Sequence, residues 1–249
     1  MRYKPMGFKT MGLINILRRA KLYLVEIPAR MRLLRGIRQL LELPDELLRD
    51  EETLMKIIRE IGLCYDDRDV YGDESPYMNA SGNGLYQLPK QLVKAMIELS
   101  RHKIDSFLEV GTYTGYTSSL LTAYLYRFNP ELKATTIDPN HNFRSYKKVR
   151  SLIPLEHRLC KSETLRGQVF DCVFIDGDHS YQGARRDFEN VGKQARICMF
   201  HDINDEMVGF ENVPRLWKEL SESGSSTETH SFLECTPGKQ VMGIGILIS

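Results

Sequence analysis

The sequence predicts an α/β fold: a doubly wound, mostly parallel sheet of seven strands, preceded by an N-terminal helical extension. From about residue 105 onward, short apolar runs alternate with segments of helical pattern, which is typical of such a sheet. The runs at 171–176 and 197–202 are continuously apolar, as expected of strands that are covered on both faces. Gly111 and Gly115 follow the first apolar run, where we expect the strand to turn sharply into a helix.

The order of the expected elements follows from these patterns. Pro44, Asp45 and Glu46 suit the N-terminus of a helix that runs to about Gly62. Further helices are expected at 89–102, 115–128, 181–194 and 211–220. Strands are expected at 106–110, 133–138, 157–160, 171–176 and 197–202, with two closing strands at about 228–235 and 240–248.

Charge and composition divide the chain into three regions. Residues 1–43 form a basic amphipathic extension, residues 44–104 a helical cap with an acidic loop, and residues 105–249 the α/β core. Residues 1–40 carry ten Lys and Arg against the single acid Glu26, whereas the remainder has a net charge of −8. Pro28 is expected to interrupt the extension, giving one or two helices.

The use of the basic extension is left open by the sequence. It could dock on the protein itself or on a second subunit, lie on an anionic membrane surface, or bind an anionic acceptor. A peripheral membrane contact through residues 1–40 and a homo-oligomer are therefore both expected alternatives.

Other classes of protein are disfavoured by composition. No uncharged stretch approaches the 18 residues of a membrane span, and the N-terminus lacks the pattern of a signal peptide. Five cysteines without C-x-x-C spacing indicate reduced thiols in a cytoplasmic protein. If the basic extension binds an anionic membrane, the expected location is its inner face. Nucleic acid is not an expected partner, because the core is acidic and shows no platform of aromatic and basic residues.

Polar residues end the predicted strands. Glu109 and Gly111 end the first strand, Asp138 the second and Asp176 the fourth, while His201 and Asp202 end the fifth. Ligands of doubly wound sheets bind beyond the carboxyl ends of the strands, so these residues predict a site at one edge. The glycines would let the backbone approach a ligand closely. Asp138 could accept hydrogen bonds from both hydroxyls of a ribose, and Ser162 and Glu163 are placed to meet an adenine edge.

Four motifs resemble those of class I S-adenosylmethionine-dependent methyltransferases, within the branch of small-molecule and sugar O-methyltransferases. They are EVGTYTGYTS (109–118), TTIDPN (135–140), IDGDHSYQGARRDFE (175–189) and HDI (201–203). The resemblance covers about residues 84–248 and implies methyl transfer from S-adenosylmethionine to a hydroxyl, most plausibly on a sugar or glycoconjugate. The implied cofactor-binding residues are Glu109, Gly111, Tyr113, Gly115, Tyr116, Thr117, Asp138, Ser162 and Asp176.

The resemblance also implies a metal and a base. Asp176 and Asp202 would share Mg²⁺ or another divalent cation, which lowers the pKa of a bound hydroxyl. His179 occupies the place of a catalytic base, so the implied catalytic residues are His179, Asp176 and Asp202. His201 replaces an acid found in the sugar-type relatives. It could act as a third ligand, or the site could bind metal weakly or not at all.

Two other functions remain as alternatives. A nicotinamide-dependent oxidoreductase would use a similar sheet, but Tyr113 stands where a dinucleotide loop has glycine. A non-catalytic binding protein on the same fold is the other alternative. The acceptor itself is not specified, and we expect its binding residues in 44–104 and in the loop 203–212.

Overall fold

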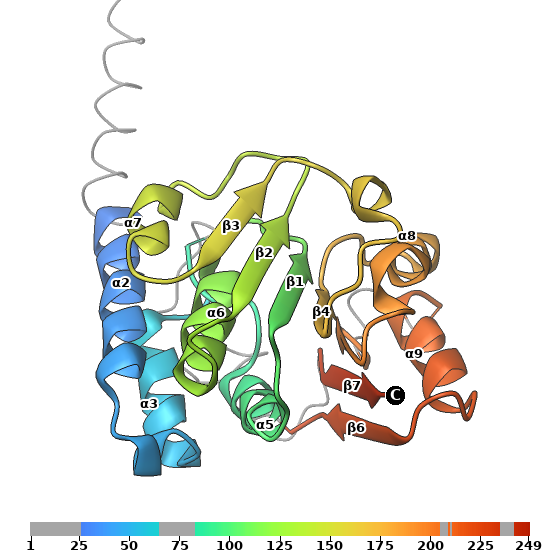
Figure 1. The fold of residues 1–249 in the computed structure, drawn as a ribbon, viewed down its shortest axis with the longest axis horizontal. Helices are drawn as coiled ribbons and strands as arrows, with labels where there is room; N and C mark the ends of the chain where they lie inside the picture. Colours follow the sequence, from blue (N-terminus) through green and yellow to red (C-terminus); the bar gives the residue numbers. More distant parts are fainter. Residues whose placement is uncertain (1–25, 65–82, 205–208, 210, 235–241) are drawn as a thin grey trace, which may run out of the picture.

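The computed structural model describes residues 26–64, 83–204, 209, 211–234 and 242–249. They contain one seven-stranded sheet in the order β3-β2-β1-β4-β5-β7-β6 (Figure 1), and β7 runs antiparallel to both of its neighbours. The predicted fold class is therefore confirmed. The strands are β1 (Ser106–Val110), β2 (Lys133–Ile137), β3 (Leu155–Arg158), β4 (Cys172–Ile175), β5 (Ile197–His201), β6 (Glu228–Phe232) and β7 (Ile244–Ile248).

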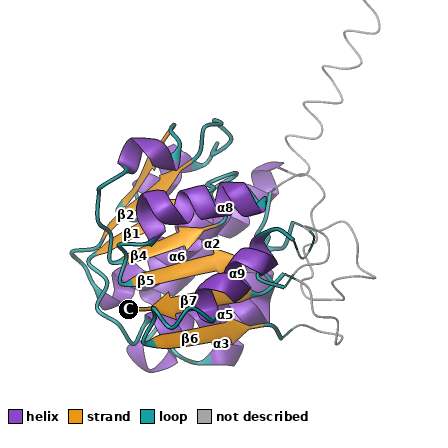
Figure 2. Cartoon of the chain, turned by 90° about the vertical axis from the view of Figure 1, so that its right-hand side faces the viewer, coloured by secondary structure: helices purple, strands orange, loops and turns teal. Residues whose placement is uncertain are grey.

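Helices cover both faces of the sheet, because alternate residues of each strand point to opposite faces. Phe107 packs with one group of helices and Leu108 belongs to the cluster on the other face. Figures 1 and 2 show these two layers. The first layer holds α2 (Ile27–Glu42), α3 (Glu51–Ile61), α5 (Pro89–Leu99) and α6 (Tyr116–Phe128); the second holds α8 (Tyr181–Asp187), the π-helix η4 (Phe188–Gly192) and α9 (Val213–Ser221).

Several element boundaries differ from the prediction. The helix expected from residue 45 is divided into a 3₁₀ turn, η2 (Asp45–Leu47), and α3. Asp50 separates them, because its backbone is extended and its carboxylate accepts the N–H of Thr53 as an N-cap. β3 begins two residues earlier than expected. A short helix α7 (Tyr146–Arg150) and a 3₁₀ turn η3 (Ser162–Leu165) were not predicted.

The described part of the basic extension packs on the protein's own body. Leu33, Ile37 and Leu40 of α2 are fully buried in the cluster that also contains α3, α5 and α6. Arg127 of α6 donates to the carbonyl oxygens of Leu40, Leu41 and Leu43, which satisfies the C-terminus of α2.

Pro28 lies at the beginning of α2, and the residues before Glu26 lie outside the described part of the chain, so the predicted interruption at Pro28 stays a prediction. Pro28 stands in the first turn of α2, where the missing N–H costs no helical hydrogen bond. Residues 1–25, and with them six of the ten basic residues, lie outside the described part of the chain. In the part that is described, none of the helices combines the length and the apolar content that a membrane span needs.

The topology places a crevice beside β1. The chain goes from β1 outward to β2 and β3, and then returns to form β4 on the other side of β1. The loops after β1 and β4 therefore leave in opposite directions, which opens space at the carboxyl ends of these strands. β4 and β5 are adjacent and parallel, as the prediction for Asp176 and Asp202 requires.

Candidate active site

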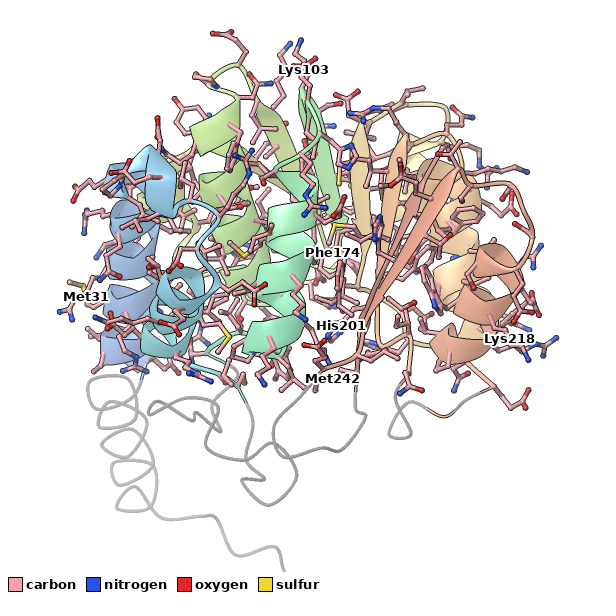
Figure 3. All side chains as sticks on the ribbon, turned by 90° about the horizontal axis from the view of Figure 1, so that it is seen from below. Met31, Lys103, Phe174, His201, Lys218 and Met242 are labelled. Atoms are coloured by element: carbon pink, nitrogen blue, oxygen red, sulfur yellow. The ribbon has the colours of Figure 1, made fainter. Side chains whose placement is uncertain are left out.

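A cavity of about 970 Å³ opens at the carboxyl ends of β1, β2, β4 and β5. Figure 3 shows the labelled His201 and Met242, both of which line the cavity, close together at one end of the molecule. Most of the predicted site residues come together here. The lining includes Gly111, Tyr113, Tyr116, Thr117, Asp138, Ser162, Asp176, His179, His201 and Asp202, but not Glu109 or Gly115.

The two glycines of the first turn are required by the protein itself. Gly111 has φ 103°, and a Cβ there would lie 2.0 Å from the carbonyl oxygen of Asp176. Gly115 has φ 77°, and a Cβ there would lie 2.4 Å from the ring of Phe143. The expectation that both glycines make room for a ligand is corrected for Gly115, which stands behind the wall and accommodates an aromatic ring. Gly111 lines the cavity, and its lack of a side chain also allows the backbone of Asp176 at the end of β4 to pack closely against it.

Glu109 lies behind the cavity wall. It is 1% exposed, and its Oε2 accepts a hydrogen bond of 2.6 Å from Thr136, whose hydroxyl is 2.7 Å from that of Thr112. Burial raises the pKa of Glu109 to about 8 despite the Thr136 bond, and the charge of Asp176 adds to the increase. Glu109 thus supports the turn after β1 through Thr136 and Thr112, from behind the cavity wall. This position does not support its assignment as a cofactor contact.

Asp138 holds the loop that forms one side of the cavity. One carboxylate oxygen accepts the N–H of Tyr113 at 2.8 Å, and the other accepts the N–H of Asn140 at 2.7 Å. Tyr113 has φ 45°, a left-handed conformation that this bond helps to stabilise. Each carboxylate oxygen retains a second lone pair, so the half-buried Asp138 can still accept bonds from a ligand.

The hydroxyl of Ser162, which lines the cavity, is bonded within the protein. It donates to Asp187 at 2.5 Å and accepts from the amide of Asn190 at 2.9 Å. These bonds position Asp187 and leave one lone pair on the hydroxyl, so its contact with an adenine edge stays a prediction. Asp187 lines the cavity, and burial raises its pKa although the Ser162 bond lowers it. The sequence pattern did not identify Asp187, because it lies inside a helix and not at a strand end.

A chain of hydrogen bonds links the two sides of the crevice. The hydroxyl of Thr117 donates to Gln87 Oε1 at 2.5 Å, and Gln87 Nε2 donates to Asp176 Oδ2 at 2.6 Å. Gln87 therefore fixes the carboxylate that ends β4 relative to the start of α6. No sequence signal marked Gln87, which lies just before α5 in a region without a motif.

Tyr116 presents a buried polar atom at the cavity wall. The residue is 2% exposed, and its hydroxyl has no hydrogen-bond partner among the described residues. A buried hydroxyl is usually satisfied, so this one is suited to a ligand.

Two carboxylates and two imidazoles cluster where β4 and β5 end. His179 Nδ1 lies 2.5 Å from Asp202 Oδ2. His201 Nδ1 lies 3.1 Å from Asp176 Oδ1 and 3.2 Å from Asp202 Oδ1. Asp202 is 4% exposed with φ 57°, so the backbone directs a buried carboxylate between the two rings.

Each charge in this cluster shifts the protonation of its neighbours. Burial favours a neutral His201, but Asp202 and Asp176 outweigh it and raise the pKa of the ring well above its usual value. The bond to Asp202 raises the pKa of His179. Burial would raise the pKa of Asp202, yet the charge of His201 and the bond from His179 hold it far below the usual range.

Asp176, His179 and Asp202 could together hold a metal ion. Each offers one ligand atom, and the three atoms lie within 4.8 Å of one another. Two carboxylate oxygens and one imidazole suit a divalent cation. The predicted third ligand, His201, is not a member of this group. His179 takes that place in the cluster.

Residues 108–203 match a family model described as a methyltransferase domain. This segment therefore resembles a methyltransferase domain. Among curated proteins, no sequence matches the chain. The model spans β1 to the end of β5, which includes Gly111, Asp138, Asp176, His179 and Asp202.

Solved structures resemble the fold of the chain. An O-methyltransferase from Streptomyces achromogenes, involved in tomaymycin synthesis and solved with SAM, is 17% identical with a TM-score of 0.50; the match covers 80% of this chain and 99% of that one. An O-methyltransferase from Bacillus cereus in complex with SAH is 15% identical with a TM-score of 0.49; that match covers 84% of this chain and 93% of the other. At 17% identity, the first likeness shows the fold alone.

Part of the cavity wall comes from outside the matched segment. Tyr86 and Gln87 precede the methyltransferase domain model and Met242 follows it. Tyr86 and Tyr113 pack edge to face at the rim, with ring centroids 5.4 Å apart. Described residues of the helical cap and of the segment before β7 thus complete the wall of the cavity.

Proposed function

We propose that the chain transfers a methyl group from S-adenosylmethionine to a hydroxyl oxygen of a small molecule, a sugar or glycoconjugate. One observation carries the proposal: the cavity joins Asp138 on one side to an ion pair between the buried Asp202 and the exposed His179 on the other. The first can bind a cofactor and the second can take a proton. The nicotinamide alternative is not favoured, because the family match is to a methyltransferase.

The residues on one side fit S-adenosylmethionine. The volume of about 970 Å³ is of the size that binds a nucleoside ligand together with a small acceptor. Asp138 would accept hydrogen bonds from the ribose hydroxyls, and the unpartnered hydroxyl of Tyr116 would bond to a polar group of the cofactor. When bound, the cofactor supplies a methyl group on a positively charged sulfur.

The residues on the other side fit the removal of a proton. Asp202 engages Nδ1 of His179, which leaves Nε2 to accept the proton of an acceptor hydroxyl. The oxygen gains the methyl group as the bond from methyl to sulfur breaks, and the proton remains on His179 until it reaches solvent. Asp202 stabilises the resulting imidazolium, while His201 keeps Asp202 ionised.

A divalent cation at Asp176, His179 and Asp202 is a second way to assist the same transfer, favoured by the proximity of the three ligand atoms. Such an ion would polarise the acceptor hydroxyl. His179 cannot be ligand and base at once, so the two versions are exclusive. Activity that survives exhaustive chelation would favour the base, and activity restored by Mg²⁺ or Mn²⁺ would favour the ion.

The rim of the cavity supports a sugar as acceptor. Tyr86 and Tyr113 are 37% and 44% exposed, large values for aromatic residues that line a cavity. Sugar rings present C–H groups on one face that pack on aromatic rings, while their hydroxyls project outward. This contact would hold the ring and leave a hydroxyl directed inward.

The basic extension supports a peripheral contact with an anionic membrane, at the inner face if the protein is cytoplasmic. Residues 1–25 contain six basic residues and no acid, and Arg35 and Arg38 are exposed on α2. Removal of residues 1–25 leaves α2 in place and should reduce sedimentation with anionic vesicles. Light scattering of the same two proteins would show whether the extension instead forms a homo-oligomer.

The methyl-transfer proposal is tested with S-adenosylmethionine whose methyl group carries deuterium. Purified protein is incubated with a panel of sugars and glycoconjugates, with and without a chelator, and the products are analysed by mass spectrometry. A labelled methyl group on oxygen supports the proposal. A label found only on nitrogen or carbon, with oxygen acceptors unchanged, would contradict it.

A further inference from the structure

A second group of metal-ligating side chains lies far from the cavity. It consists of Glu98 on α5 and Glu228 and His230 on β6, whose ligand atoms lie within 4.8 Å of one another. β6 runs parallel to β5, because each is antiparallel to β7. Glu228 is level with Ile197 at the start of β5, since both pair with Ile248. The group is therefore at the amino ends of the strands, opposite the site at His201.

Figure 3 shows the same separation. Lys103, which follows α5 by a few residues, lies at the opposite end of the molecule from His201 and Met242. The cluster at the end of α5 is consequently not part of the catalytic cavity, and no residue of it lines that cavity.

The three side chains converge from two elements. Glu228 and His230 are two residues apart on an edge strand and point to the same face. α5 packs on β6 and ends beside it, with Glu98 in its last turn. Glu98 is only 7% exposed although it is charged and lies where the helix dipole disfavours an anion. Such a position requires compensating positive charge.

The protein supplies this charge only in part. Arg101 donates to Glu98 Oε2 at 2.7 Å, which occupies one carboxylate oxygen. Glu98 Oε1 faces His102 Nε2 at 3.3 Å and His230 Nε2 at 3.8 Å. His230 Nε2 lies 3.5 Å from Glu228 Oε2, and this buried nitrogen has no hydrogen-bond partner among the described residues.

We propose that Glu98, Glu228 and His230 bind a divalent metal ion of the Zn²⁺ type. The separations of 3.5 and 3.8 Å are long for hydrogen bonds. They approach the spacing of about 3.3 Å between two ligands of a tetrahedral ion with bonds near 2.05 Å. One imidazole and two carboxylates favour Zn²⁺ or a similar metal over Mg²⁺. The ion would supply the missing positive charge between His230 and the two carboxylates.

The site would fasten the edge of the sheet. β6 is the last strand, paired only with β7, and the ion would join it to α5 through side chains. His102 would remain a hydrogen-bond donor to Glu98 and orient it. Glu228 is 62% exposed on its side chain, so the ion can enter from solvent and keep a water as its fourth ligand.

The test counts Zn²⁺ bound after equilibrium dialysis, using metal analysis by mass spectrometry. All proteins carry Asp176→Asn and Asp202→Asn, which removes the carboxylate ligands of the cavity. His230→Gln is compared with His141→Gln, an exposed histidine outside both clusters. We expect one equivalent of Zn²⁺ in the background protein and in His141→Gln. In His230→Gln we expect no equivalent, or an affinity at least tenfold weaker.

Two results would overturn the proposal: no Zn²⁺ on the background protein, or an equivalent that persists with unchanged affinity in His230→Gln. Glu228→Gln, an exposed change on the same strand, repeats the test if His230→Gln does not fold. Zn²⁺ should also raise the melting temperature of the background protein but not that of either ligand variant.

Discussion

The two sides of the cavity hold their carboxylates in different ways. Asp138, at the end of β2, is half-buried and accepts two backbone N–H groups. Asp202, at the end of β5, is 4% exposed and lies between the imidazoles of His179 and His201. The first carboxylate organises a loop through backbone hydrogen bonds, whereas the second is part of a network of mutually dependent charges.

This difference suggests that the β2 side binds the cofactor and that the β5 side carries out proton transfer. A loop fixed by backbone hydrogen bonds is preorganised, so it can hold a cofactor without rearrangement. A buried carboxylate paired with an imidazole that reaches solvent can instead accept and release a proton. We therefore expect substitutions on the β2 side to change affinity and substitutions on the β5 side to change rate. The predictions below test this division, in decreasing order of expected effect.

Asp202→Asn should give the largest effect. Loss of the charge leaves His179 without its anionic partner and His201 with one carboxylate fewer, so the rate of transfer should fall by about 10²- to 10⁴-fold. Binding of S-adenosylhomocysteine should change little. Asp178→Asn is the matched control, because Asp178 lines the same cavity but contacts neither imidazole. An equal loss of rate and of cofactor affinity in Asp202→Asn would show that the β5 side also determines cofactor binding, which contradicts the proposed division.

Gly111→Ala should destabilise the fold by about 3 kcal/mol, because it combines a left-handed conformation with a collision. Its Cβ would lie 2.0 Å from the carbonyl oxygen of Asp176. Gly167→Ala is the control, since Gly167 has φ 83° but open space around its Cβ. That control should cost only about 1 kcal/mol. Urea unfolding measures the loss of unfolding free energy in both variants. Equal losses would mean that the residue after β1 does not pack tightly against the end of β4.

Asp138→Asn should weaken S-adenosylhomocysteine binding by about 10- to 100-fold, the value of a hydrogen bond to a charged acceptor. The rate at saturating cofactor should stay within a few fold. Glu156→Gln, an exposed acid on β3 outside the cavity, is the control. If Asp138→Asn binds S-adenosylhomocysteine normally but transfers the methyl group slowly, Asp138 acts in the reaction itself, which contradicts the proposed division between the two sides.

Glu109→Gln should reveal the smallest effect, a pH dependence of stability. The pKa of Glu109 is raised to about 8, so the folded chain keeps a proton that the unfolded chain loses above about 4.5. Its favourable contribution is complete below pH 4.5 and is lost as the pH rises to about 8. The variant should match the wild type at pH 5 and melt at a higher temperature than the wild type at pH 9. Identical melting temperatures at pH 9 would show that Glu109 is not buried as described.

The sequence predicted the strand ends because each apolar run stops at a polar residue. Asp138, Asp176 and Asp202 therefore fall at one edge of the sheet once the parallel topology is known. The strand boundaries were accurate where burial on both faces makes the run continuous. β3 was shifted by two residues, because its exposed Glu156 and half-buried residues give no clear pattern.

Residues from distant loops could not be predicted in this way. Gln87 reaches Asp176 across 89 positions of sequence, and Phe143 meets Gly115 from a loop before α7. Neither follows a strand or a motif. The bonds of Ser162 were missed for a related reason: its partner Asp187 lies on another element, so spacing alone could not show that the hydroxyl is already bonded. Tertiary contacts, and not local pattern, decide which polar groups face the ligand.

The most direct test of the central claim is titration calorimetry of the purified full-length chain with S-adenosylhomocysteine. We predict binding at one site per chain, weakened in Asp138→Asn and retained in Asp202→Asn. An absence of binding heat over a range of temperatures, together with an unchanged melting temperature at saturating ligand, would contradict the assignment of the cavity to a methyl donor.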